Sequence, residues 1–330
     1  MEKNEPPEAN LGRNWVFFRL LEVALLAVFN LNRLLVAVLP PEAVCAMARG
    51  LGELVYRLHP RMRRKLLDTL RGALPEIEDQ RELERLAARI CSSPIMATLE
   101  LIIFHKYRDE MLQRMEIEGM EHLDRADERG KGVIIFAPHI GGFALAQPLL
   151  VILGKGYAPV ILNPAASPVP RYILSVALYT QRIAYDRNLP VFWAGGKDVV
   201  PRMRRHLEEG KRIGMTIDVE GGSVLEFFGQ PTSMTSGIGH FALDTGAAII
   251  PVTLLRTEDP LKYRLTICEP LAYELTGDRK QDLKNIMDAV VACSEDMIRR
   301  APEQWMGWFG LPEWRKRAQE ILAKKAEKGS

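Results

Sequence analysis

The chain lacks several features that mark common classes of protein. Its 330 residues include only four cysteines, which are scattered and form no Cys-x-x-Cys pair. This argues against a zinc site and against a disulfide framework, so reduced thiols in a cytosolic setting are the simpler interpretation. No Gly-x-Ser-x-Gly turn and no Walker loop occur, which argues against serine hydrolases and P-loop nucleotidases. We predict no cofactor and no metal site.

An uninterrupted apolar run of about 20 residues, as a transmembrane helix requires, is also missing. The most apolar stretch, residues 15–39, is broken by Arg19, Glu22, Asn30, Asn32 and Arg33. Drawn as a helix, it gathers most of these residues on one side, which predicts an interfacial helix or a marginal membrane anchor. The alternative is a helix packed on the protein's own core. A cleaved signal peptide is a poor match, because no small-residue cleavage site follows.

An excess of charge of one sign is missing too, because the formal net charge is only +2. Basic residues nevertheless gather at 61–65, at 202–212 and at 315–328. Such clusters attract phosphates, anionic lipid or an acidic carrier protein, although solvated helix faces would look the same. We predict no nucleic-acid partner.

What the chain does contain is enough apolar material for a large core. The composition is 47% hydrophobic and 26% charged, which excludes wholesale disorder. The length fits two domains, or one α/β domain with a helical extension. The predicted organisation is a flexible N-terminus (1–14), a helical membrane-associated region (15–118), an α/β domain (119–315) and a basic tail (316–330).

Apolar strands alternate with helices in the second part of the chain. The predicted strands are 133–137, 159–162, 190–193, 213–218 and 248–255, with a further edge strand at 263–267. The predicted helices between and after them are 143–153, 171–184, 199–209, 238–245 and 278–300. Within the N-terminal region we expect helices at 41–58, 60–74 and 79–110, the last broken near Pro94. This alternation predicts a mostly parallel sheet with helices on both faces.

His139 is the most informative single residue. It follows a buried strand and Pro138, and precedes Gly141 and Gly142, which make the turn into an apolar helix. Open α/β sheets bind ligands at this edge, and adjacent glycines suggest the close approach of a ligand or another backbone. The helix dipole disfavours the imidazolium, so a neutral ring that accepts a proton is plausible at pH 7. The alternative is a core histidine with satisfied hydrogen bonds.

A second group comprises Thr216, Asp218 and Glu220. In a strand these side chains share one face, and the following glycines put both carboxylates near a carboxyl-terminal strand end. If the strands are parallel, this is the same sheet edge as His139. The alternative is a pair of solvated loop acids.

Weaker candidates for substrate binding lie elsewhere. Phe228 and Gly229 belong to a Phe-Phe-Gly-Gln-Pro segment, and Ser236 begins a Ser-Gly-Ile-Gly segment that offers backbone N–H groups to a phosphate at a helix start. Arg171 and Arg182 lie between two predicted strands and are candidates for binding a phosphate-bearing acceptor.

Several ordered segments together resemble one family. They are Leu-Leu-Asp-Thr-Leu at 66–70, Leu-Pro-Glu at 74–76, the His139 turn, the segment 227–231, Thr-Gly-Ala at 245–247 leading to Pro251, and Pro-Glu-Gln-Trp at 302–305. In this order they resemble the lipid A biosynthesis (lauroyl/myristoyl) acyltransferases, members of the lysophospholipid acyltransferase superfamily. The resemblance implies an acyl-carrier-protein or acyl-CoA donor, a lipid acceptor, and residence on the cytoplasmic face of the inner membrane.

One departure from the family pattern concerns the catalytic acid. The family has His, four residues, then Asp or Glu, whereas this chain has Ala144 at the acid position and Gly142 in place of Asn. The basic aromatic ending is altered too, to Gly-Trp-Phe-Gly-Leu-Pro at 307–312. In the family the His is the general base and the acid fixes its tautomer. Disabling the corresponding acid of serine-protease triads costs about 10⁴ in rate.

Three interpretations follow. The first is an acyltransferase in which His139 is the base, Asp218 or Glu220 replaces the missing acid, and Gly141 and Gly142 leave room near the oxyanion. The second keeps the transfer chemistry but moves an aminoacyl-type group or uses an amine acceptor. The third is a catalytically inactive lipid-binding homologue.

Overall fold

A seven-stranded sheet forms the centre of the computed structural model, which describes residues 15–329 apart from 165–166, 185, 187 and 197. The expected flexible segment 1–14 lies outside the described residues. The strand order is β1-β9-β8-β2-β5-β3-β4. The strands are β1 (Glu116–Glu118), β2 (Val133–Phe136), β3 (Ala158–Leu162), β4 (Phe192–Ala194), β5 (Arg212–Met215), β8 (Ala248–Arg256) and β9 (Tyr263–Ile267).

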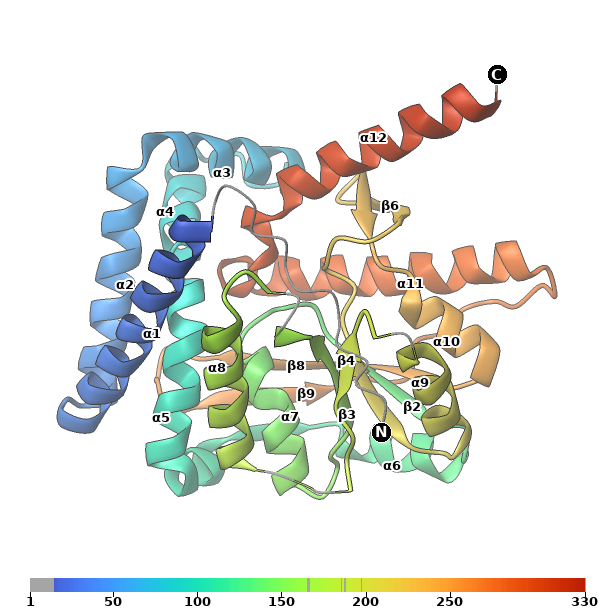
Figure 1. Cartoon of the computed structure of the whole chain (residues 1–330), viewed down its shortest axis with the longest axis horizontal. Helices are drawn as coiled ribbons and strands as arrows, with labels where there is room; N and C mark the ends of the chain where they lie inside the picture. Colours follow the sequence, from blue (N-terminus) through green and yellow to red (C-terminus); the bar gives the residue numbers. More distant parts are fainter. Residues whose placement is uncertain (1–14, 165–166, 185, 187, 197, 330) are drawn as a thin grey trace.

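Helices cover both faces of this sheet (Figure 1). They are α1 (Trp15–Val38), α2 (Pro41–Leu58), α3 (Pro60–Ala73), α4 (Gln80–Ile90), α5 (Ser93–Arg114), α6 (Met120–Glu128), α7 (Phe143–Ile152), α8 (Pro170–Ile183), α9 (Val199–Glu208), α10 (Gly237–Thr245), α11 (Arg279–Arg300) and α12 (Leu311–Gly329). Strands β8, β2, β5, β3 and β4 run parallel, which confirms the expected α/β fold with a mostly parallel sheet.

Strand β2 illustrates why the fold follows from the sequence. Val133 and Ile135 pack in one core cluster, with apolar residues of α5 and α7, while Ile134 and Phe136 pack in the other, with residues of α10 and α11. All four side chains are therefore buried, as in a parallel strand covered on both sides. Burial on both faces explains why residues 133–136 are all β-branched or aromatic.

Two expectations about strands are wrong. Tyr263–Ile267 is a strand, but it is not at the edge, because the three-residue strand β1 pairs with it on the outside. Strand β5 ends at Met215, so Thr216, Asp218 and Glu220 follow the strand and do not share a strand face. An antiparallel hairpin outside the main sheet, β6 (Ser223–Phe227) and β7 (Gln230–Met234), was not predicted.

The N-terminal helices pack against the α/β part. Helix α1 contacts α2, α5 and α8, and by length and composition it is apolar enough to cross a membrane. Of the polar residues that interrupt the apolar sequence of α1, Glu22 and Asn32 are buried against the protein, whereas Asn30 and Arg33 are exposed. At the other end of the chain, the basic residues of the predicted tail lie on α12, a helix that begins at Leu311.

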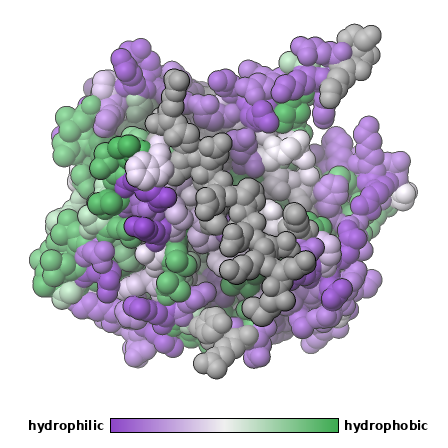
Figure 2. Space-filling model, in the orientation of Figure 1, coloured by the Kyte–Doolittle hydropathy of each residue, from purple (hydrophilic) through white to green (hydrophobic). Residues whose placement is uncertain are grey.

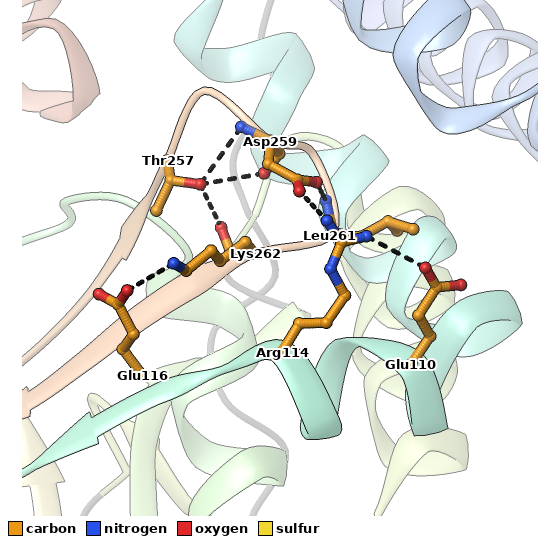
Figure 3. A network of polar contacts seen from close by, with 7 residues as sticks. All are labelled: Glu110, Arg114, Glu116, Thr257, Asp259, Leu261 and Lys262. Atoms are coloured by element: carbon orange, nitrogen blue, oxygen red, sulfur yellow. Dashed lines mark hydrogen bonds and ion pairs between the residues drawn. The ribbon is translucent and has the colours of Figure 1, made fainter.

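A polar network fixes the loop between β8 and β9 to the end of α5 (Figure 3). Arg114 pairs with Asp259 of the loop and, at 3.1 Å, with Glu110 of its own helix. The Thr257 hydroxyl donates to the Lys262 carbonyl at 2.9 Å inside the loop. This loop follows the carboxyl end of β8, so the network steadies the sheet edge on which His139 lies.

Candidate active site

His139 lies three residues beyond β2, in the turn that leads into α7. Gly141 has a φ of +59°, and a Cβ there would come within 2.2 Å of the Leu254 carbonyl oxygen, so only glycine fits this turn. The Gly141 N–H donates to the Gln304 carbonyl at 3.1 Å, and the Gly142 N–H donates to the Leu254 carbonyl at 2.7 Å. The two glycines thus let the turn pack on the end of β8, and both N–H groups are engaged within the fold.

The carboxylate of Asp218 meets this turn from the neighbouring strand end. Its Oδ1 lies 2.9 Å from His139 Nδ1, and its Oδ2 accepts the His139 backbone N–H at 2.8 Å. The Thr216 hydroxyl donates to Oδ1 as well. Because β5 is paired with β2 in parallel, the loop after β5 reaches the same edge as His139. The Asp218 side chain is fully buried, whereas a third of the His139 side chain is exposed.

Trp305 completes the surroundings of Asp218. Its indole Nε1–H donates to Asp218 Oδ2 at 2.7 Å, and the side chain has no exposed surface. The backbone on either side of Trp305 holds the turn, because the Met306 N–H donates to the His139 carbonyl at 3.0 Å and Gln304 accepts the Gly141 N–H. Segment 304–306 therefore contacts both the histidine turn and the acid.

The Gln304 side chain fixes this segment to β8. Its Oε1 accepts the Arg256 N–H at 3.0 Å, and its Nε2 donates to the Arg256 carbonyl at 3.1 Å. The Gln304 side chain thus pairs with both the N–H and the carbonyl of the Arg256 backbone. The turn, the acid and the end of β8 form one connected polar unit.

The electrostatics of the pair favour a charged acid beside a basic imidazole. Burial alone would raise the pKa of the Asp218 carboxyl, but the charge of His139 and the hydrogen bonds from His139 and Thr216 outweigh it and lower that pKa to about 2. Burial alone would lower the pKa of His139, but the carboxylate more than offsets this and raises it above the usual value. With Nδ1 bound to Asp218, Nε2 is the nitrogen left to exchange a proton with a ligand.

An apolar cavity of about 720 Å³ opens beside the His139 ring. Its walls come from α1, α5, α7, β3 and α8, and they include Leu25, Phe29, Leu101, Phe143, Ala144, Ile161, Tyr172, Val176 and Ala177. The Phe143 ring stands edge-on to the imidazole, 4.8 Å away between centroids. Ala144 lines the cavity and adds no charge to it.

The structure separates the two acids that follow β5. Asp218 turns inward to His139, whereas Glu220 is more than half exposed and lies 3.9 Å from Arg317 of α12. Arg171 and Arg182 are exposed on α8 and do not line the cavity. The Arg171 backbone N–H, at the start of α8, donates to Glu22 of α1 at 2.6 Å.

Phe228, Gly229 and Ser236 lie away from the cavity. Phe228 and Gly229, both with positive φ, form the tight turn of the β6–β7 hairpin. The Phe228 ring is buried beside Trp305 and Trp308, with ring centroids 6.1 Å and 5.6 Å apart. The Ser236 hydroxyl lies 2.7 Å from that of Ser223. Phe228 and Gly229 therefore form the hairpin turn, and Ser236 contacts Ser223, the first residue of β6.

Sequence reasoning did not assign a role to Trp305 or Gln304. Both belong to the Pro-Glu-Gln-Trp segment, whose presence was noted without a physical reason. A buried indole N–H needs a hydrogen-bond acceptor. A tryptophan next to a glutamine, in a segment flanked by Pro302 and Gly307, could therefore have indicated that this segment contacts a polar group.

Comparison with known proteins gives distant relatives of one kind. The chain is 22% identical over 216 residues to a lipid A biosynthesis acyltransferase of Haemophilus influenzae, covering 65% of this chain and 64% of that protein. It is 24% identical over 147 residues to a phosphatidylinositol mannoside acyltransferase of Mycolicibacterium smegmatis, covering 42% and 45%. A Mycobacterium tuberculosis protein of the same description is 27% identical over 156 residues, covering 45% and 46%. The chain thus spans less than two thirds of the length of each relative.

A family model covers much more of the chain than these pairwise matches do. The model of the bacterial lipid A biosynthesis acyltransferases matches residues 17–316, which include all but the first two residues of α1, the whole sheet and the segment that carries Trp305. The chain, with its His139 turn at the head of an apolar cavity, therefore belongs to the bacterial lipid A biosynthesis acyltransferase family.

Proposed function

We propose that this protein transfers an acyl group from a carrier-protein or CoA thioester to a lipid acceptor, with His139 as general base and Asp218 as the acid that orients it. The observation that carries the proposal is the 2.9 Å contact between His139 Nδ1 and Asp218 Oδ1, at the head of an apolar cavity. A base needs a fixed tautomer with its second nitrogen facing the substrate, and this contact supports that arrangement.

In this mechanism the proton moves from the acceptor to His139 and then to the leaving thiolate. His139 Nε2 takes the proton of the acceptor hydroxyl or amine as its oxygen or nitrogen attacks the thioester carbonyl carbon. The new ester or amide bond forms, the C–S bond breaks, and the imidazolium gives its proton to the leaving thiolate. Asp218 stays ionised throughout and stabilises the imidazolium, as its pKa of about 2 supports.

Asp218 takes over the role that the family gives to the residue at position 144. The family's acid lies on the helix after the histidine, whereas here the acid follows β5 and reaches the ring from the next strand. The replacement leaves Ala144 free to line the cavity. This relocation supports an active enzyme over an inactive lipid-binding homologue.

The cavity supports a fatty acyl group over an aminoacyl group. A volume of about 720 Å³ with mostly apolar walls suits a long hydrocarbon chain. The relatives are described as a lipid A biosynthesis acyltransferase and a phosphatidylinositol mannoside acyltransferase, and both descriptions name a lipid, which supports a lipid acceptor here. We place the reaction at the cytoplasmic face of the inner membrane.

The test is transfer from a labelled long-chain acyl-carrier-protein or acyl-CoA thioester to a bacterial lipid extract, with products identified by mass spectrometry. We expect His139→Ala to lower the rate by more than about 10⁴, because the general base is removed. His240→Ala is the control, since His240 is an exposed histidine of α10 outside the cavity. The proposed mechanism is wrong if His139→Ala transfers acyl groups as fast as the parent.

Two further outcomes decide between the alternatives. Amino acids attached to lipids in cells that carry the gene, and absent from cells that lack it, would identify an aminoacyl-type transferase. Tight lipid binding with no transfer from any thioester, unchanged by His139→Ala, would identify an inactive homologue.

A further inference from the structure

A buried amide belongs to the wall of the apolar cavity beside His139. Asn32 of α1 is 8% exposed and lines the cavity, and among the residues that the structure describes its side chain has no hydrogen-bond partner. Burying an amide in this way is unfavourable, because the amide loses its hydrogen bonds to water and gains none. A partner for the Asn32 side chain therefore has to enter the cavity from outside the fold.

Asn30, on the same helix, shows how α1 satisfies an asparagine. Asn30 is exposed, its Nδ2 donates to the Leu26 carbonyl at 2.9 Å, and its Oδ1 accepts a hydrogen bond from Arg33 at 3.1 Å. The side chain of Asn32 makes neither kind of contact. Helix α1 thus provides partners for the exposed amide and leaves the buried one unpaired.

The surroundings of Asn32 on α1 are apolar. Leu25, Val28, Phe29 and Asn32 line the cavity, and their spacing places all four on one side of the helix. The outer side of α1 is apolar as well, since hydrophobic residues gather on the side of the molecule that α1 and α2 cover (Figure 2). A leucine at position 32 would continue the inner stripe without leaving a polar group unpaired, so packing alone does not explain the asparagine.

Most other polar side chains of the cavity wall are paired or exposed. The hydroxyls of Thr98 and Tyr172 lie 3.4 Å apart, and the Thr180 hydroxyl donates to the Val176 carbonyl at 3.0 Å. Gln181 lines the cavity too, but it is exposed, so water can bind its amide. These groups do not depend on a ligand for their hydrogen bonds.

Gln147 of α7 also lines the cavity without a hydrogen-bond partner among the described residues, but it differs from Asn32 in burial and position. Gln147 is only partly buried, so its amide is less completely removed from water. It follows Phe143 by four residues, which is about 6 Å along the helix. Because the Phe143 ring contacts the imidazole of His139, Gln147 belongs to the part of the cavity near the histidine.

Asn32 lies farther from the histidine. Glu22 of α1 accepts a backbone N–H at the start of α8, at 2.6 Å, whereas the Phe29 ring packs on Tyr179 farther along α8, with centroids 5.5 Å apart. The two helices therefore run in the same direction. Helix α8 starts after β3, which is parallel to β5 and hence to β2, so it leads away from the sheet edge of His139. Asn32 is about 15 Å beyond Glu22 along α1, toward the far end of the cavity.

We propose that Asn32 binds a hydroxyl group on the half of the acyl chain remote from the thioester, so that the cavity selects hydroxylated acyl donors over plain ones. The proposal rests on the proposed function, because the cavity has to hold the acyl chain. A hydroxyl and a carboxamide each donate and accept, so Nδ2 donates to the hydroxyl oxygen or Oδ1 accepts its hydrogen. A plain chain leaves the amide unpaired, and a site built for a hydroxyl rejects an analogue that lacks it. Water is a poor substitute, because it needs two or more polar partners and the side chains of Val28 and Phe29 offer none.

The first experiment compares donors in the transfer assay. The donors are the dodecanoyl thioester and a series of hydroxydodecanoyl thioesters whose hydroxyl group moves from the β carbon to the ω carbon. We expect kcat/KM of the parent to be highest for a hydroxyl in the remote half of the chain, by about tenfold or more over dodecanoyl. A β-hydroxyl, which lies next to the thioester, is expected to give no such gain.

Asn32→Leu is expected to lose this preference and to use the dodecanoyl donor at least as well as the parent. Asn30→Leu is the matched control, because it makes the same substitution on the same helix at an exposed position outside the cavity, and it should keep the parent's preference. The proposal is wrong if no hydroxyl position raises kcat/KM, or if Asn32→Leu keeps the preference. It is also wrong if Gln147→Leu removes the preference and Asn32→Leu does not.

Stability gives an independent test of the unpaired amide. Because a leucine continues the apolar stripe of α1, Asn32→Leu is expected to unfold at the same or a higher concentration of denaturant than the parent. Unfolding at a clearly lower concentration would show that the Asn32 amide has a partner within the fold, which would remove the reason for a ligand hydroxyl.

The second experiment measures binding without transfer. Full-length His139→Ala protein, which lacks the proposed base, is titrated calorimetrically with dodecanoic acid and with the same series of hydroxydodecanoic acids. We expect a hydroxyl in the remote half to tighten binding by about tenfold, and the added Asn32→Leu change to abolish the gain. Equal affinities for all the acids would overturn the proposal. If no thioester supports transfer by the parent but this binding preference is present, the proposed function has failed and the selectivity of the cavity stands.

Discussion

The two ends of the cavity are held in different ways. At the His139 end, the ring, the turn and the acid are connected by hydrogen bonds that come from β5, β8 and the segment of Trp305. At the far end, α1 and α8 form a mostly apolar wall, and the two helices are joined outside the cavity by the hydrogen bond from the Arg171 N–H to Glu22. Apolar packing is non-directional, whereas hydrogen bonds fix geometry. Under the proposed function, the catalytic residues are therefore held in a fixed geometry, and the acyl chain is bound by an adaptable apolar wall.

The largest expected effect of a single change at the fixed end, after loss of His139 itself, comes from Asp218→Asn. The amide keeps the shape but favours the wrong tautomer of the ring, so we expect the transfer rate to fall by about 10⁴. Glu220→Gln is the control, because Glu220 is exposed and faces Arg317. Equal losses from the two variants would mean that the contact with His139 has no special role.

The same variant changes the pH dependence. The base acts when neutral, so activity rises with pH through the pKa of His139, which Asp218 raises above its usual value. Without the carboxylate that pKa falls, and the acidic limb of the residual rate is expected to move to lower pH. A pH–rate profile of kcat/KM measures this shift.

Trp305→Phe tests the next contact in the same network. Without this hydrogen bond the carboxylate is positioned less precisely against His139, so we expect a decrease of roughly 10- to 100-fold in kcat/KM. The freed carboxylate is a stronger base, holds the imidazolium more tightly, and is expected to move the acidic limb to higher pH, opposite to Asp218→Asn.

Trp308→Phe is the matched control for Trp305→Phe. Trp308 is equally buried in the same aromatic cluster, but its N–H donates to the Pro302 carbonyl at 2.7 Å and not to Asp218. It is expected to lower stability without moving the pH profile. A pH shift in Trp308→Phe as large as that in Trp305→Phe would assign both effects to packing.

Elements that depend on residues close together in sequence were the ones that the sequence predicted. The buried run at 133–136 and the glycines after His139 predicted a strand, a turn and a helix start, because each depends on neighbouring residues. The β6–β7 hairpin was not predicted, because each of its strands has only five residues and about half of these residues are polar.

The candidate site was predictable only in part, for the same reason. Asp218 and Glu220 are indistinguishable as a local pattern, and what separates them is contact with residues about 80 positions away in sequence. The strand argument that grouped them was wrong, since β5 ends at Met215. Nothing in the residues next to Trp305 indicates that its N–H donates to a carboxylate.

At the adaptable end, Glu22→Ala is expected to have a moderate effect on stability. The carboxylate of Glu22 accepts the first N–H of α8 from another helix, and loss of such a cap costs about 1–2 kcal/mol. Chemical denaturation measures the change. Glu53→Ala, which breaks an exposed pair with Arg57 within α2, is the control and is expected to cost less than about 0.5 kcal/mol. Equal costs would mean that α1 is not fastened through Glu22.

The smallest expected effect concerns the length of the acyl chain, through Ala177→Phe. Ala177 lines the cavity from α8, so a phenyl ring there takes space from the end of a long chain. Each methylene that can no longer be buried costs about 0.8 kcal/mol, a factor of roughly four in kcat/KM. We expect a loss of a few-fold to tenfold with long-chain donors and little change with short ones. Leu178→Phe enlarges the next residue of the same helix, which is half exposed and does not line the cavity, and it should leave the chain-length profile unchanged. If both variants gave the parent's profile, the acyl chain would not lie along α8, and the adaptable wall would have to be sought elsewhere in the cavity.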